Sequence, residues 1–83
     1  MKEYVLITGA TSGIGYEFSK IFAENKYNLI LSGRNIQILE NMKEQLEEKY
    51  KIVVYIFEKD LSKKGNAEEL YKEIKKNNIN IDI

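Results

Sequence analysis

Residues 4–15 read YVLITGATSGIG and decide how the fold begins. The run at 4–7 is apolar and favours a β-strand that is covered on both faces, as in a parallel sheet. Three glycines follow, at Gly9, Gly13 and Gly15, and a helical pattern starts directly after them. A strand, a glycine-rich turn and a helix in this order predict a turn that receives a phosphate group.

The rest of the chain alternates between helical and strand patterns. The apolar residues of the first helix follow helical spacing and predict one buried stripe: Ile14, Phe18, Ile21 and Phe22. The later elements are, in chain order, a strand at 29–31, a helix at 36–50, a strand at 52–57, a helix at 67–76 and the start of a strand at 79–83.

The element order βαβαβαβ predicts an α/β fold, a Rossmann-like open parallel sheet with right-handed crossovers. We expect strand order 3-2-1-4, with the first two helices on one face and the third helix on the other. A chain of 83 residues is one small unit without linker or repeat.

Composition excludes several classes of function. The chain has 13 basic and 13 acidic residues, so we expect no binding to nucleic acid or to a membrane surface. It has no Cys and no His, which excludes thiolate nucleophiles, histidine-based triads and the usual zinc sites, and we expect no metal. The N-terminal apolar run is too short for a signal peptide or a membrane span, so we expect a cytoplasmic protein.

Each glycine of the turn has a separate expected role. Gly9 allows a sharp exit from the strand, Gly13 lets a pyrophosphate approach the start of the helix, and Gly15 lets the helix pack closely on the strand. The hydroxyls of Thr11 and Ser12 can donate further hydrogen bonds. The alternative is that this turn is only a strand-to-helix connector.

Residues 8–15 (TGATSGIG) resemble the TGxxxGIG fingerprint of classical short-chain dehydrogenases/reductases, which includes Ile14. Residues 32–35 (SGRN) resemble the end of that family's second strand, and residues 81–83 resemble the lead-in to its fourth. The pair Asp60-Leu61 is similar to the pair that contacts adenine in the family. The resemblance implies that residues 1–83 are the N-terminal half of a dinucleotide-binding domain, without the catalytic half.

The cofactor is expected to be NADP(H) rather than NAD(H). Counting twenty residues on from Gly13 leads to Gly33, beside Arg34; an acid in this region would suit the ribose of NAD, and an arginine suits the phosphate of NADP. Ser32 and Asn35 could assist this phosphate. The alternatives are a solvated Arg34, a helix-capping Asn35 and an Asp60 that only forms a turn.

No catalytic residue is expected in this chain. The resemblance implies a catalytic serine, tyrosine and lysine on later elements. Three tyrosines here are followed four residues later by a lysine, but their expected places, beside the turn, at a strand end and on the third helix, argue against catalysis: Tyr16, Tyr55 and Tyr71.

We therefore predict the NADP(H)-binding portion of a short-chain oxidoreductase that is inactive as this isolated chain. The alternative is a stand-alone nucleotide-sensing or interaction module without redox chemistry. Apolar surface left bare by truncation on the first and fourth strands predicts a homodimer.

Overall fold

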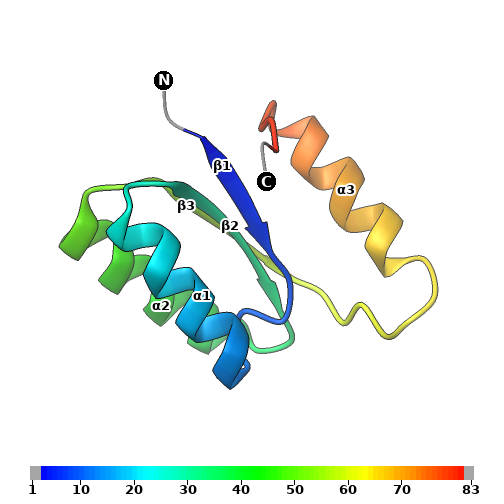
Figure 1. Cartoon of the computed structure of the whole chain (residues 1–83). Helices are drawn as coiled ribbons and strands as arrows, with labels where there is room; N and C mark the ends of the chain where they lie inside the picture. Colours follow the sequence, from blue (N-terminus) through cyan, green and yellow to red (C-terminus); the bar gives the residue numbers. More distant parts are fainter. Residues whose placement is uncertain (1–2, 82–83) are drawn as a thin grey trace.

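The computed structural model describes residues 3–81, which form a three-stranded parallel sheet with helices on both of its faces (Figure 1). The elements are, in chain order, β1 (Tyr4–Ile7), α1 (Gly13–Glu24), β2 (Asn28–Gly33), α2 (Ile36–Tyr50), β3 (Val54–Glu58) and α3 (Asn66–Lys76). The sheet order is β1-β2-β3, and both strand pairs are parallel. Helices α1 and α2 cover one face and α3 lies over the other, as the sequence predicts.

The fourth strand is not confirmed. Residues 79–81 belong to no strand within the described part of the chain, and Asp82 and Ile83 lie outside the described residues. Ile79 is buried against Ile74 of α3, whose carbonyl oxygen accepts a hydrogen bond from the Ile79 N–H at 3.2 Å. The described part of this segment thus closes the end of α3, and the sheet order is shown only for the first three strands.

Two apolar cores lie on the two faces of the sheet. Leu29 and Leu31 of β2 point toward α1 and α2, whereas Ile30 between them points toward α3. This alternation follows from the two-residue period of a strand. Since every residue of β2 is buried, its apolar run LIL at 29–31 serves both cores at once.

Helix α1 turns a different face to the sheet than its apolar pattern predicts. Ile14 is 74% exposed, and Phe18 and Ile21 are each 51% exposed. The buried residues of α1 are small ones: Gly15, Ser19 and Ala23. The predicted buried stripe is wrong for these three apolar residues, because the buried face of α1 consists of small residues, and at Gly15 the backbone of the preceding loop leaves no room for a Cβ atom.

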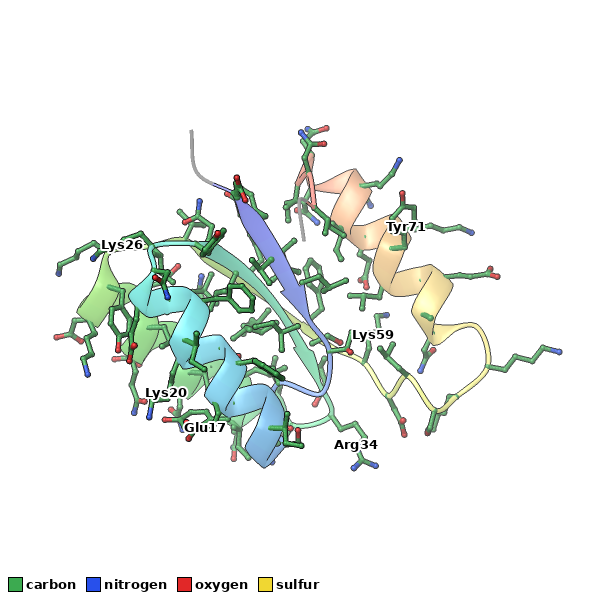
Figure 2. The ribbon with its side chains drawn as sticks, in the orientation of Figure 1. Glu17, Lys20, Lys26, Arg34, Lys59 and Tyr71 are labelled. Carbon is green, nitrogen blue, oxygen red and sulfur yellow. The ribbon has the colours of Figure 1, made fainter. Side chains whose placement is uncertain are left out.

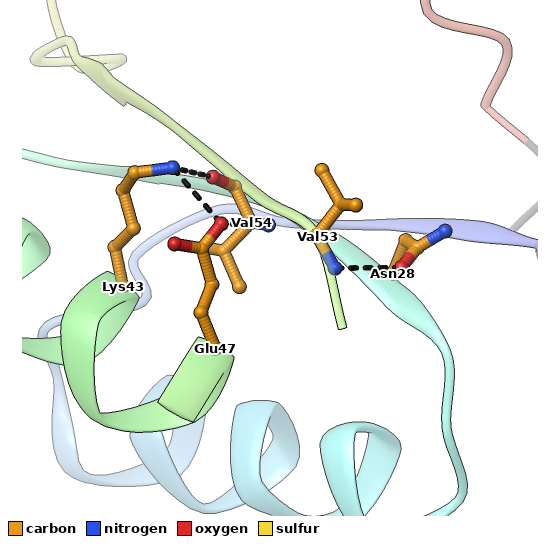
Figure 3. A network of polar contacts seen from close by, with 5 residues as sticks. All are labelled: Asn28, Lys43, Glu47, Val53 and Val54. Carbon is orange, nitrogen blue, oxygen red and sulfur yellow. Dashed lines mark hydrogen bonds and ion pairs between the residues drawn. The ribbon is translucent and has the colours of Figure 1, made fainter. Parts of the chain in front are cut away.

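Side chains of α2 bind the first residue of β3 at the outer edge of the sheet (Figure 3). The Glu47 carboxylate accepts a hydrogen bond from the Val54 N–H at 3.0 Å, and the Lys43 ammonium donates to the Val54 carbonyl oxygen. Burial alone would raise the pKa of Glu47, but the bonds from Val54 and Lys43 outweigh it and lower that pKa. Before β3, the Asn28 side chain accepts from the Val53 N–H at 2.8 Å, so β3 begins two residues later than predicted.

Candidate functional site

A cleft of about 580 Å³ lies at the carboxyl ends of the three strands. This is the edge at which open parallel sheets bind ligands. Residues that follow each of the three strands line it: Thr8, Gly9, Thr11, Ser12, Gly33, Arg34, Lys59, Asp60, Leu61 and Ser62. Three segments far apart in the sequence thus form one cavity, whose volume is within the usual range for small-molecule sites.

The loop from β1 to α1 is held by its own short hydrogen bonds. Gly9 has φ +62°, a left-handed conformation that glycine adopts without strain. Ser12 caps α1: its hydroxyl donates to the Gly9 carbonyl oxygen at 2.7 Å and accepts from the Gly15 N–H at 3.3 Å. The chain therefore reverses within a few residues and leads directly into the helix.

Gly15 is where the helix and the loop meet most closely. A Cβ atom at this position would lie 2.2 Å from the Gly9 carbonyl oxygen and 2.9 Å from the Ala10 Cα atom. Both are backbone atoms, which cannot move aside as the end of a side chain can. At Gly13, in contrast, a Cβ atom would have no heavy atom within 4 Å. Of these two glycines, one is required by the protein's own packing and the other faces open space.

The first turn of α1 can bind an anion. The first N–H groups of any α-helix have no acceptor within the helix. Ser12 accepts from the N–H groups of Gly15 and Tyr16, while those of Gly13 and Ile14 have no acceptor among residues 3–81 and can bind water or a ligand. The helix dipole places about half a positive charge at this end. The exposed Ile14 side chain does not line the cleft, so only its backbone is suited to this role.

The end of β2 brings one positive charge to the cleft. Arg34 is exposed there, and Figure 2 shows its side chain extending away from the sheet. Ser32 is completely buried and outside the cleft, and its hydroxyl oxygen makes no hydrogen bond within residues 3–81. Asn35 caps α2 by accepting from the Ile38 N–H at 3.2 Å, and it too is outside the cleft lining.

The loop after β3 is shaped by Asp60. Its carboxylate accepts from the Ser62 hydroxyl at 2.6 Å and from the Ser62 N–H at 3.0 Å. These two bonds, aided by the nearby Arg34 charge, lower the pKa of Asp60 despite its partial desolvation. Leu61 is half-buried beside it in the cleft. Asp60 thus forms a turn, and one of its carboxylate oxygens is engaged in doing so.

Four residues of the cleft are absent from the sequence-based site: Thr8, Gly33, Lys59 and Ser62. Each lies at or just beyond the end of a strand, so the rule that ligands bind at the carboxyl ends of parallel strands could have found them. None of the cleft residues is a tyrosine. Outside the cleft, the Lys20 ammonium group lies over the ring of Tyr16, and the Lys75 ammonium group lies over the ring of Tyr71.

The sequence matches the short chain dehydrogenase family over residues 3–83. The chain belongs to this family. Among its relatives, the very-long-chain 3-oxoacyl-CoA reductase of Vanderwaltozyma polyspora is 38% identical over 72 residues, which are 87% of this chain and 20% of that protein. The sulfoacetaldehyde reductase 2 of Chromohalobacter salexigens is 40% identical over 52 residues, which are 63% of this chain and 21% of that protein.

Solved structures agree with this assignment. An alcohol dehydrogenase of Thermococcus sibiricus, complexed with 5-hydroxy-NADP, superposes with TM-score 0.92 and 28% identity, covering 99% of this chain and 35% of that one. A Sphingobium yanoikuyae short-chain dehydrogenase in complex with NADPH gives TM-score 0.80 and 28% identity, covering 87% and 28%. This member of the short-chain dehydrogenase family spans about a fifth of the length of its first relatives. Within residues 3–81, no helix is both long and apolar enough to cross a membrane.

Proposed function

We propose that the cleft binds NADP(H), and that this chain is the cofactor-binding portion of a short-chain oxidoreductase. The observation that carries the proposal is the meeting of three segments in one cavity: the glycine loop, Arg34 and the Asp60 turn. Their chemistry fits a pyrophosphate, a 2′-phosphate and an adenine, in that order along the sheet edge. No observation favours the stand-alone sensing module over this function.

Arg34 supports NADP(H) over NAD(H). It is exposed at the end of β2, and it is the one arginine of the chain. A guanidinium can hold a phosphate with two parallel charge-assisted bonds, each contributing about 1.5–3 kcal/mol. Since about 1.4 kcal/mol is a tenfold change in affinity, we expect NADP⁺ to bind about ten to a hundred times more tightly than NAD⁺.

Calorimetric titration tests the cofactor assignment. The ligands are NADP⁺, NAD⁺ and 2′-phospho-AMP, and the proteins are the parent chain, Arg34→Ala and the control Lys64→Ala. Lys64 is an exposed lysine on the loop after β3 but outside the cleft lining. We expect Arg34→Ala to lose the preference for NADP⁺ and Lys64→Ala to keep it. Equal binding of both dinucleotides by the parent chain would refute the assignment.

Hydride transfer is not expected from this chain alone. No tyrosine lies in the cleft lining, and the family fingerprint found here concerns cofactor binding only. This chain spans 20% of the Vanderwaltozyma polyspora reductase and 35% of the Thermococcus sibiricus alcohol dehydrogenase, so we assign it no reaction and no substrate. Cytoplasmic location stays a prediction from the sequence.

The sequence places the expected homodimer contact on the first and fourth strands, but the fourth strand is not confirmed, so we propose self-association through α1 instead. The exposed side chains of Ile14, Phe18 and Ile21 lie four and three residues apart and form one apolar stripe. Contiguous exposed apolar surface of this kind favours association with a second copy. We expect sedimentation at micromolar concentration to show a homodimer that Phe18→Lys converts to a monomer. A parent chain that stays monomeric would refute this part.

A further inference from the structure

Lys59 connects the two sides of the cleft. It directly follows β3 and lines the cleft, and its N–H donates to the Gly33 carbonyl oxygen at 2.8 Å. Its side chain is only 19% exposed. Figure 2 shows this side chain directed toward α3, whereas Arg34 extends into solvent from the other side of the cleft. Lys59 is therefore placed to act on α3.

Two carboxylates of α3 hold the Lys59 ammonium group. It lies 3.1 Å from Oε2 of Glu73 and 3.8 Å from Oε2 of Glu69. Glu73 Oε2 is shielded from solvent and makes no hydrogen bond within residues 3–81, so the nearby ammonium balances its charge. Lys59 is mostly shielded, whereas the Glu73 side chain is 46% exposed, so water partly screens this pair and its attraction directs the Lys59 side chain toward α3 at a modest gain in free energy. The Lys59 ammonium group, being paired with Glu73, is then not free to bind a phosphate group of the cofactor.

The turn at Asp60 is fixed from both sides. On one side Lys59 is tied to Glu73, and on the other the Asn66 side chain of α3 donates to the Asp60 carbonyl oxygen at 2.8 Å. The Asp60 carboxylate has one oxygen engaged by Ser62. Its direction in the cleft thus depends on how this loop is held against α3.

We propose that Lys59 is a positioning residue, which through its ion pairs with Glu73 and Glu69 holds Asp60 in the orientation that recognises the amino group of adenine. The proposal rests on the function proposed above and adds a residue that does not touch the ligand. It predicts that loss of the ion pair leaves Asp60 in the cleft but weakens its selectivity for the base.

A comparison of two ligands tests this role. The ligands are NADP⁺ and its deamino analogue, nicotinamide hypoxanthine dinucleotide phosphate, in which an oxygen replaces the adenine amino group. We expect the parent chain to prefer NADP⁺ by about tenfold, as for one hydrogen bond to a charged group. Lys59→Met and Glu73→Gln should reduce this preference to about threefold or less, and Lys59→Arg should restore most of it. Partial unfolding lowers both affinities equally, so it does not change the ratio.

Several results would overturn the proposal. One is an unchanged base preference in both Lys59→Met and Glu73→Gln, and another is a parent chain with no base preference. A third is a fall in the ratio of NADP⁺ to NAD⁺ affinity in Lys59→Met, which would make Lys59 a phosphate ligand. Should Lys59→Met not fold, the isosteric Glu73→Gln decides alone. Failure of the proposed function is distinct, because the parent chain would then not bind NADP⁺ or not distinguish it from NAD⁺.

Discussion

The two loops that enclose the cleft are held in different ways. The loop from β1 to α1 is fixed by its backbone, with Gly9 and Gly15 so close that no Cβ atom fits at Gly15. The loop from β3 to α3 is fixed by side chains, chiefly Asp60, Asn66 and Lys59. Backbone contacts tolerate no added atom, whereas partly exposed polar contacts between side chains can be removed one at a time at a modest cost. A substitution at the closest backbone contact of the first loop should therefore disrupt that loop completely, whereas single substitutions in the second loop should change its conformation only in part.

The largest effect is expected from Gly15→Val. The new side chain would collide with the Gly9 carbonyl group, so α1 would have to move away from the loop. We expect the free energy of unfolding to fall by about 3–5 kcal/mol, a large part of the stability of a small domain. Urea unfolding followed by circular dichroism measures this. Gly13→Ala is the matched control and should change stability by less than about 1 kcal/mol. Equal effects of both variants would contradict the backbone account of this loop.

Gly13→Val separates ligand binding from folding in the same loop. A Cβ atom here would meet no heavy atom within 4 Å, so we expect the fold to be kept. It would instead fill the space in which we expect the pyrophosphate, and we expect NADP⁺ to bind at least about tenfold more weakly. Calorimetric titration of a variant with unchanged circular dichroism measures this. Unchanged affinity would show that the ligand does not lie against α1.

The smallest effect is expected from lowering the pH, which should weaken the turn at Asp60 in the loop from β3 to α3. The pKa of Asp60 is lowered, first by the Ser62 hydroxyl and then by the Ser62 N–H. The ionised Asp60 carboxylate thus contributes fully to the free energy of unfolding above its ordinary pKa of 3.8. This contribution is lost as the pH falls through the lower pKa of the folded state. We expect NMR titration of the carboxyl carbon to show no transition between pH 8 and about pH 5, and Ser62→Ala to raise this pKa. A pKa above the ordinary value would mean that the turn is not formed.

The comparison also explains which parts of the site could be predicted from the sequence. The glycine loop could be predicted, because glycines at this spacing between a strand and a helix usually indicate a phosphate-binding turn. The positions of Arg34 and Asp60 at strand ends followed from the predicted elements. The strand-end rule could have placed Lys59 in the cleft, but its ion pairs could not be predicted, because Glu69 and Glu73 are brought to it only by the packing of α3. The pairing of charges between distant segments leaves no periodic trace in a sequence.

Helix α1 shows the limit of periodicity as a guide to burial. The spacing of Ile14, Phe18 and Ile21 correctly indicated a helix but not the face that packs on the sheet. The small residues Gly15 and Ser19 mark that face, and their meaning depends on how closely two backbones approach. The apolar pattern alone predicted the wrong buried face of α1, because it reports the hydrophobicity of side chains and not whether they are small enough to pack where the helix is buried.

The bonds of Lys43 and Glu47 to Val54 at the start of β3 have a consequence for the chain before and after folding. The segment IVVYIF has the composition of an amyloid-forming stretch, rich in branched and aromatic residues and without charge. In the folded molecule Lys43 and Glu47 occupy the Val54 backbone groups that an incoming strand would need. While α2 is packed on the sheet, these two charged side chains prevent a strand of another molecule from forming hydrogen bonds with Val54 at this edge, and so oppose the start of a fibril.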